Sequence, residues 1–311
     1  MPATQEERLQ ELTDRLENGI KDLYASGQYA EYLAAMSRFH HYSFGNVILI
    51  LLQCPTATKV AGYNRWKRDF GRQVKKGEHG ISILCPCPQS RWMQKQQRDP
   101  NTGQPLFAPD GSAVMETVKV IIPKFKIGTV FDVSQTEGRE LPSIAISELS
   151  GEVGFFQDLY DCLTDISPVP IIEDTVPGAA KGYFSSEQQK IVLRPGMPQL
   201  QIIKTLVHEI AHAILHDRNK VPEEEQKERH QKEIEAESVA YVVCQGIGLD
   251  TSDYSFGYIA SWSSDKELKD LKASLDVIHT TAGDMLSKIE KALGLSAEQE
   301  YTPQKQHHQQ R

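Results

Sequence analysis

The second half of the chain contains the run QLQIIKTLVHEIAHAILH, residues 199–216. Its apolar residues recur at steps of three and four, the spacing that places side chains on one face of a helix. We therefore predict a helix over this run. Its predicted buried side comprises Ile202, Ile203, Leu206, Ile210, Ala213 and Ile214.

The same helix carries the pattern His208-Glu209-x-x-His212. Residues four apart lie one above the other on a helix, so both imidazoles can bind one metal ion, and Glu209 can hold a water molecule there. The alternative is a pair of surface histidines, which the apolar neighbours disfavour. Catalytic zinc takes three protein ligands. His216 is excluded as the third because it lies about 12 Å along the helix axis from His208.

The next predicted helix, residues 231–246, offers three glutamates as the third ligand: Glu233, Glu235 and Glu237. Its packed face is defined by Ala236, Val239, Ala240 and Val243. At about 100° per residue, Glu233 lies nearest the centre of that face. We predict that Glu233 binds the metal and that Glu237, one turn later, orients a ligand histidine. The alternative is a solvated acidic face.

These residues predict zinc-dependent peptide hydrolysis, in which Glu209 is the general base for a water held by the ion. Tyr183 lies in a strand-like segment before the helix and is a conceivable donor to the oxyanion. The alternative, which we favour, is a packed or solvated tyrosine.

The first half of the chain contains a strongly basic segment. Residues 37–98 contain eleven Lys and Arg and two acidic residues, a net charge of +9. Because the net charge of the whole chain is −8, the remaining residues together carry −17. Such an asymmetry indicates a local site for a polyanion. Residues 62–68 and 71–80 mix cations, aromatic rings and glycines, the ingredients of single-stranded nucleic acid binding. A solvated basic face around a core tryptophan would look the same.

We predict an α+β protein of two domains. In the first, residues 1–142, helices fill most of residues 6–53, and strands at 81–84 and 118–122 flank a long hairpin or loop. A Pro-containing linker, residues 138–147, follows.

The second domain, residues 148–295, is expected to be mainly helical with a small sheet. Its last segment, residues 265–293, reads as one helix or as two helices broken near Gly283. Residues 296–311 are predicted to form a disordered tail.

Bulk composition limits where such a protein works. No stretch of about 18 apolar residues suggests a membrane span, and the N-terminus lacks a signal-peptide pattern. The five cysteines include no Cys-x-x-Cys pair, which favours a reducing compartment. We therefore expect a cytoplasmic protein with no membrane partner.

The predicted helix pair resembles the ImmA/IrrE-like and related glutamate-type zinc peptidases. These share a His-Glu-x-x-His helix followed by a helix with Glu-x-x-Ala-(Asn/Asp/Glu), which residues 233–237 match. The resemblance, over about residues 178–248, implies Glu233 as the third ligand. Many relatives carry Asn or Asp where this chain has Glu237.

The N-terminal region resembles the N-terminal domain of the ArdC antirestriction proteins. The matching segments are residues 43–46, the stretch around Trp66 and residues 74–80, within a similarity that spans about residues 6–142. This resemblance implies a single-stranded-DNA-binding domain joined to a metallopeptidase-like domain in a protein of a mobile element. The candidate DNA contacts are Asn46, Trp66, Lys67, Arg72, Lys75 and Lys76.

The sequence thus predicts a zinc peptidase that acts on a protein or peptide and is coupled to single-stranded DNA. One alternative is an antirestriction protein that coats single-stranded DNA and has a structural or unused metal site. The other is an ImmA-like regulatory protease that cleaves a repressor, with the basic segment contacting protein.

Overall fold

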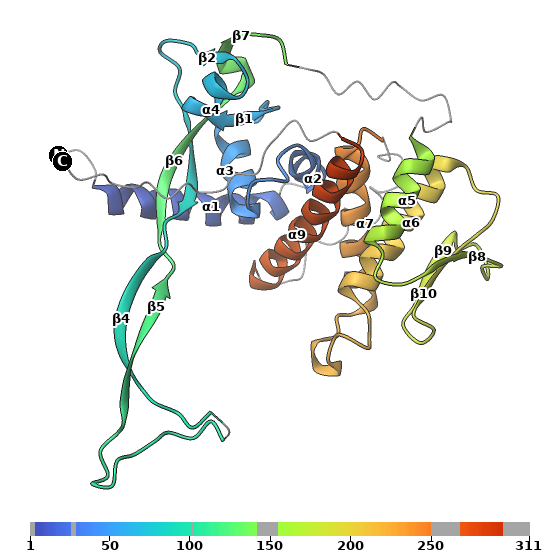
Figure 1. The fold of residues 1–311 in the computed structure, drawn as a ribbon. Helices are drawn as coiled ribbons and strands as arrows, with labels where there is room; N and C mark the ends of the chain where they lie inside the picture. The colour runs from blue at the N-terminus through green and yellow to red at the C-terminus, as the bar shows by residue number, and fades with distance from the viewer. Residues whose placement is uncertain (1–3, 26–28, 101, 142–154, 250–267, 295–311) are drawn as a thin grey trace.

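A computed structural model describes residues 4–25, 29–100, 102–141, 155–249 and 268–294 (Figure 1). Helices combine with small sheets, so the predicted α+β class is confirmed. Most of the predicted linker and the whole predicted tail lie outside the described residues.

The described chain begins with the helices α1 (Gln5–Ala25), α2 (Tyr29–Arg38) and α3 (Phe44–Gln53), as the apolar periodicity predicted. α3 ends shortly before Pro55, which cannot continue a helix. Ser43 is the N-cap residue of α3, but its side chain makes no capping hydrogen bond.

A three-stranded antiparallel sheet packs beside α3. Its order is β1 (Val60–Gly62), β6 (Phe125–Asp132) and β3 (Ile81–Pro86). Two α3 side chains bind the outer edge of β3, because the amide of Asn46 pairs with both backbone groups of Leu84 and that of Gln53 pairs with those of Ser82.

A smaller unit lies at the end of this sheet. It contains the helix α4 (Tyr63–Arg68), a two-stranded ladder of β2 (Arg72–Val74) with β7 (Thr136–Gly138), and the 3-10 turn η1 (Val133–Gln135). Asp132 caps η1 and also accepts hydrogen bonds from the backbone N–H groups of Thr58 and Lys59. This carboxylate joins β6 to the segment before β1.

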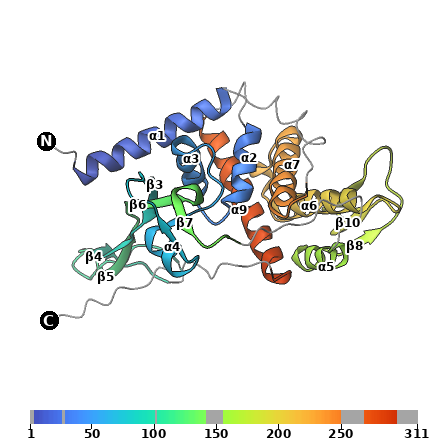
Figure 2. The ribbon, with the colours of Figure 1, turned by 90° about the horizontal axis from the view of Figure 1, so that it is seen from above.

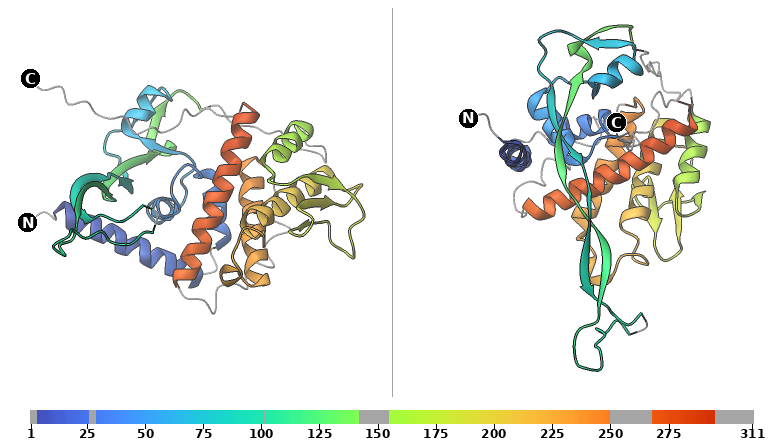
Figure 3. Two further views of the ribbon diagram at one scale, coloured as in Figure 1. Left: turned by 60° about the horizontal axis from the view of Figure 1, so that its bottom comes forward. Right: turned by 60° about the vertical axis from the view of Figure 1, so that its left-hand side comes forward.

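The strands β4 (Gln89–Gln96) and β5 (Met115–Ile122) form a long antiparallel hairpin, so of the two predicted alternatives, a hairpin or a loop, the structure has the hairpin. The hairpin extends away from the body of the molecule (Figure 3). Trp92 and Ile121 are the most exposed of its large apolar residues, at 66% and 69%. A surface of this kind is typical of a contact region.

The second half places a small sheet beside two packed helices (Figure 1). β10 (Lys190–Leu193) is the central strand, parallel to β8 (Ile171–Glu173) and antiparallel to β9 (Gly182–Ser185). The helices of this half are α5 (Phe156–Ile166), α6 (Gln199–Leu215), α7 (Arg229–Gly246) and α9 (Leu268–Ala292), with the 3-10 turn η2 (Glu223–Glu225) before α7.

The predicted burial of α6 is correct at four positions: Ile203, Leu206, Ile210 and Ala213. Ile202 is half-buried and Ile214 is 38% exposed, whereas Val207 and Ala211, which were not predicted, are fully buried, so the packed face is displaced from the predicted one. The possible break at Gly283 is absent, because α9 continues through it. A Cβ at Gly283 would lie 3.3 Å from the His40 carbonyl oxygen, so glycine here serves close packing.

One buried hydrophobic cluster extends through both halves of the chain. α2 packs against α7 (Figure 2), and the hydroxyls of Tyr29 and Ser238 lie 3.1 Å apart in this contact. The division at residues 142 and 148 stays a prediction, but the two predicted domains share a core. In the described ranges, no helix has the length and apolar character of a bilayer span.

Candidate metal centre and basic surface

His208 and His212 on α6 meet Glu233 on α7. The two histidine Nε2 atoms lie 3.1 Å apart, and Glu233 Oε2 lies 3.6 Å from one and 3.7 Å from the other. Ligands about 2.0–2.1 Å from a tetrahedral zinc are about 3.3 Å from each other. The three predicted ligands therefore stand at the separations that one small divalent ion requires.

The electrostatics of this cluster favour a bound cation. Burial alone would lower the pKa of His208, but the carboxylates of Glu233 and Glu237 raise it to about 9. The pKa of Glu233 is in turn held far below its ordinary value by hydrogen bonds to His208 and His212. Surroundings that hold a proton this firmly also favour a divalent ion, so the residues present fit a metal.

Glu237 lies where the sequence placed it, against the far side of His208. Its Oε2 is 3.2 Å from His208 Nδ1, and its Oε1 is 2.7 Å from Lys204 Nζ. Burial opposes the charged form of Glu237, but His208 and Lys204 keep its pKa below the ordinary value. A carboxylate at Nδ1 leaves His208 Nε2 directed at the metal position.

His216 and Glu235 form a second support, which the sequence analysis missed. Glu235 Oε2 accepts from His216 Nε2 at 3.0 Å, so neutral His216 accepts through Nδ1, and His212 Nδ1, 3.0 Å away, is the donor. Burial lowers the pKa of His216, which keeps the ring neutral. This series of hydrogen bonds leaves a lone pair on His212 Nε2, as a metal ligand needs.

Contrary to the prediction from helical spacing, Glu233 does not lie nearest the centre of the packed face of α7. Glu235 is fully buried, where Lys227 and Ser274 also donate to its carboxylate. The side chain of Glu233 is 34% exposed. Glu233 still joins the cluster because it lies on the side of α7 that faces His208 and His212, whereas Glu235 points toward α9.

Glu209 is 8% exposed and lies beside the three ligands. Its Oε2 accepts from the Phe184 N–H of β9 at 2.8 Å, and burial raises its pKa. β9 comes this close to α6 because residue 182 is glycine: a Cβ there would meet Thr205 at 2.9 Å. Tyr183 is half-buried on the same strand, and its role as an oxyanion donor stays a prediction.

Two of the predicted DNA contacts are structural. Trp66 is fully buried, its Nε1 donates to the Phe131 carbonyl at 2.9 Å, and its ring packs on Phe70. A ring in the core cannot stack on a base, so the structure has the alternative of a core tryptophan, and Trp66 is not a DNA contact. Asn46 is 7% exposed, and its side-chain amide is hydrogen-bonded to the backbone of Leu84. Asn46 is therefore also not a surface contact.

The four basic residues among the predicted DNA contacts fall into two groups, exposed lysines and a half-buried arginine. Lys67, Lys75 and Lys76 are exposed, although Lys75 Nζ also donates to the Ser134 carbonyl at 2.9 Å. Arg72 is half-buried and donates to Thr136 and to the backbone that follows it, which holds β7 against β2. The three lysines remain candidates for phosphate contacts, and Arg72 is first of all a structural residue.

Two family matches cover these two regions. Residues 3–131 match the N-terminal domain of the anti-restriction factor ArdC, and residues 170–244 match the IrrE N-terminal-like domain of the peptidase family M78. The chain is an ArdC-like protein with a peptidase-like domain. Both matches fall inside the predicted domains, whose outer limits stay predictions.

The ArdC-like chain is also similar to individual proteins. It is 27% identical to an uncharacterised protein of Bacillus anthracis over 94% of its length, but it spans only about half, 53%, of that relative. The metal-free structure of the antirestriction ArdC protein from plasmid R388 is 22% identical, with a TM-score of 0.45 over 81% of this chain and 86% of that one. Its Mn(II)-bound structure is 20% identical, with a TM-score of 0.45 over 81% and 84%.

In this ArdC-like chain two large aromatic residues of the basic segment are exposed, Tyr63 at 51% and Trp92 at 66%, and Trp92 was not among the candidates selected from the sequence. Trp92 lies opposite Lys119 in the β4–β5 ladder, and both are exposed. The available signal was its place between the cations Arg91 and Lys95. Flat rings beside cations are the elements of single-strand recognition.

Proposed function

We propose that this protein is a zinc-dependent peptidase and that its ArdC-type domain binds single-stranded DNA. The observation that carries the peptidase function is the arrangement of His208, His212 and Glu233 at tetrahedral spacing beside the buried Glu209. The match to a peptidase family supports it.

The proposed chemistry assigns each side chain one task. A zinc ion held by the two histidines and Glu233 would supply Lewis acidity toward a peptide carbonyl and acidify a water molecule. Glu209 accepts the proton of the attacking water, because burial raises its pKa and so strengthens it as a base. It then returns the proton to the leaving nitrogen. The Phe184 N–H holds the carboxylate in place for both transfers.

Metal content and peptide hydrolysis test this function together. We expect one zinc at this centre in the wild type, and loss of that zinc and of hydrolysis in His212→Ala and Glu233→Gln. His230→Ala is the matched control, because it removes an exposed histidine from the same helix, α7. Retention of all zinc and activity by both ligand variants would overturn the assignment.

The DNA-binding part rests on the exposed lysines of residues 67–76 and on the β4–β5 hairpin, which presents Trp92 beside Lys119. Cations follow the phosphates while a ring stacks on a base, so binding needs little sequence preference. The match to the ArdC N-terminal domain supports this partner and an antirestriction role, which we propose serves a mobile element. We place the protein in the cytoplasm, in keeping with its five free cysteines.

A DNA-coating protein whose metal centre is structural is the second candidate, because the buried Tyr29–Ser238 contact ties the ArdC-type region to the helix that carries Glu233. Antirestriction activity in cells separates the two. The peptidase function requires that Glu209→Gln abolish antirestriction while single-strand binding is kept. Full antirestriction in this variant would favour the coating function.

A further inference from the structure

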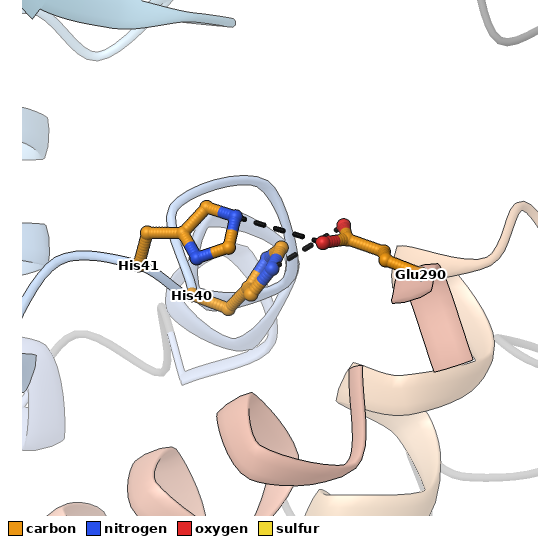
Figure 4. Close-up of side chains that lie close together, drawn as sticks. All are labelled: His40, His41 and Glu290. Atoms are coloured by element: carbon orange, nitrogen blue, oxygen red, sulfur yellow. Dashed lines mark ion pairs between the residues drawn. The ribbon is translucent and has the colours of Figure 1, made fainter. Parts of the chain in front are cut away.

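A second group of metal-binding side chains lies outside the centre described above. His40 and His41 occupy the turn between α2 and α3, and Glu290 lies near the end of α9. Both imidazoles point toward the carboxylate of Glu290 (Figure 4). His40 Nε2 lies 3.3 Å from Glu290 Oε1, and His41 Nε2 lies 3.6 Å from Glu290 Oε2.

These separations suit a bound ion. One ligand atom from each residue lies within 4.8 Å of the others. Each imidazole nitrogen lies near a different oxygen of the Glu290 carboxylate, at 3.3 and 3.6 Å, which is close to the ligand–ligand distance of about 3.3 Å around tetrahedral zinc. The two imidazole rings are 3.9 Å apart between centroids. Adjacent residues on a helix point in different directions, but α2 ends at Arg38, and the turn that follows directs both rings to one side.

The protonation of His40 points to a ligand. His40 Nδ1 lies 3.2 Å from the carbonyl oxygen of Ser37, which can only accept, so Nδ1 carries the proton. In the neutral ring, Nε2 then carries a lone pair. This atom is buried and forms no hydrogen bond of good geometry, in a side chain that is 7% exposed. A backbone carbonyl at one nitrogen and an unsatisfied lone pair at the other is the state of a metal-binding histidine.

The group sits where two parts of the chain meet. Gly283 allows α9 to approach the His40 backbone, and the Glu290 side chain is 22% exposed beside this contact. The His41 side chain is 44% exposed, which leaves an open side for a water molecule as a fourth ligand. An ion here would join the α2–α3 turn of the ArdC-type region to the helix that follows the peptidase-like region.

We propose that His40, His41 and Glu290 bind one divalent ion, zinc by their donor set, and that this ion fastens the α2–α3 turn to α9. Two imidazoles and one carboxylate are borderline ligands that suit zinc better than magnesium or calcium. The ion has a structural role, separate from the centre on α6 and α7. A simple ion pair between Glu290 and protonated histidines is the competing arrangement.

Zinc stoichiometry in the full chain tests the proposal. His212→Ala serves as the background, since it removes a ligand of the first centre, and Glu233→Gln is a second background if that protein fails to fold. After equilibration with zinc and removal of excess ion, we expect one zinc per chain in the background. Adding His41→Ala or Glu290→Gln should remove it. His41 is the more exposed of the two, so its variant keeps the test independent of folding.

Replacing His307 and His308 by Ala is the matched control, because it removes the other adjacent histidine pair of the chain and should leave the zinc in place. An ion that binds only the folded state raises the melting temperature, so zinc should raise it in the background and not after Glu290→Gln. No zinc in either background, or equal zinc with and without Glu290→Gln, would overturn the proposal and favour the ion pair.

Discussion

The metal centre on α6 and α7 and the basic region around α4 and β2 differ in how the sequence encodes them. At the metal centre, residues with a regular spacing converge on one point. In the basic region, a mixture of aromatic and basic residues divides between core and surface, with Trp66 inside and Lys76 outside. The difference teaches that helical spacing predicts which side chains meet, whereas composition does not predict which are exposed.

The two regions also differ in how firmly their side chains are held. Each histidine of the metal centre has a supporting partner: Glu237 for His208 and His216 for His212. The lysines of the basic region are exposed and act mainly as point charges. We therefore expect large and specific effects of substitution at the first and small, nearly additive effects at the second.

The largest expected effect is that of Glu209→Gln. Glutamine can still accept from the Phe184 N–H but cannot take a proton from water, so hydrolysis should fall by about 10²–10⁴-fold. Zinc content should not change, because Glu209 is not a ligand. Steady-state kinetics and metal analysis of the same preparation check this. Loss of zinc in this variant would show that Glu209 belongs to the ligand set.

Replacing each of the two tryptophans by alanine tests the comparison between core and surface most directly. Trp66→Ala should lower the free energy of unfolding by about 3–5 kcal/mol, because it leaves a cavity in the core. Trp92→Ala should leave stability unchanged and weaken single-stranded DNA binding by about 1–3 kcal/mol, because it removes an exposed ring. Denaturation and binding curves are measured for both. Destabilisation by Trp92→Ala would end its assignment as a surface contact.

Glu237→Gln should weaken zinc binding by about 10–100-fold without abolishing it, since a neutral amide supports the His208 ring less well than a carboxylate. Competition with a coloured chelator measures this affinity. Glu228→Gln is the matched control, because Glu228 is an exposed glutamate directly before α7. Equal affinities in the two variants would remove Glu237 from the metal centre.

The smallest effect is expected from replacing Lys75 and Lys76 together by Ala. If each lysine neutralises one phosphate, the log–log dependence of binding on salt should flatten by about 1.4, at about 0.7 per phosphate. Replacing Lys272 and Lys291, two exposed lysines of α9, by Ala is the control. A slope that changes equally in both pairs would mean that the DNA does not lie along residues 67–76.

The sequence by itself determined the helices of the second half and the meeting of His208 with His212, because both follow from a period of 3.6 residues. The same kind of pattern predicted α1, while turn signals between strands indicated a long hairpin or loop where β4 and β5 lie. The short strands β1, β2 and β7 were missed, since segments of three residues carry too little periodicity to be recognised.

Only the tertiary structure decided how residues far apart in the chain divide their tasks. It buried Glu235 with His216, Lys227 and Ser274, while Glu233 was left facing the two histidines. It also placed Trp66 in the core and brought Glu290 to the turn before α3. Local spacing cannot predict such outcomes, because the burial of a side chain depends on the element packed against it.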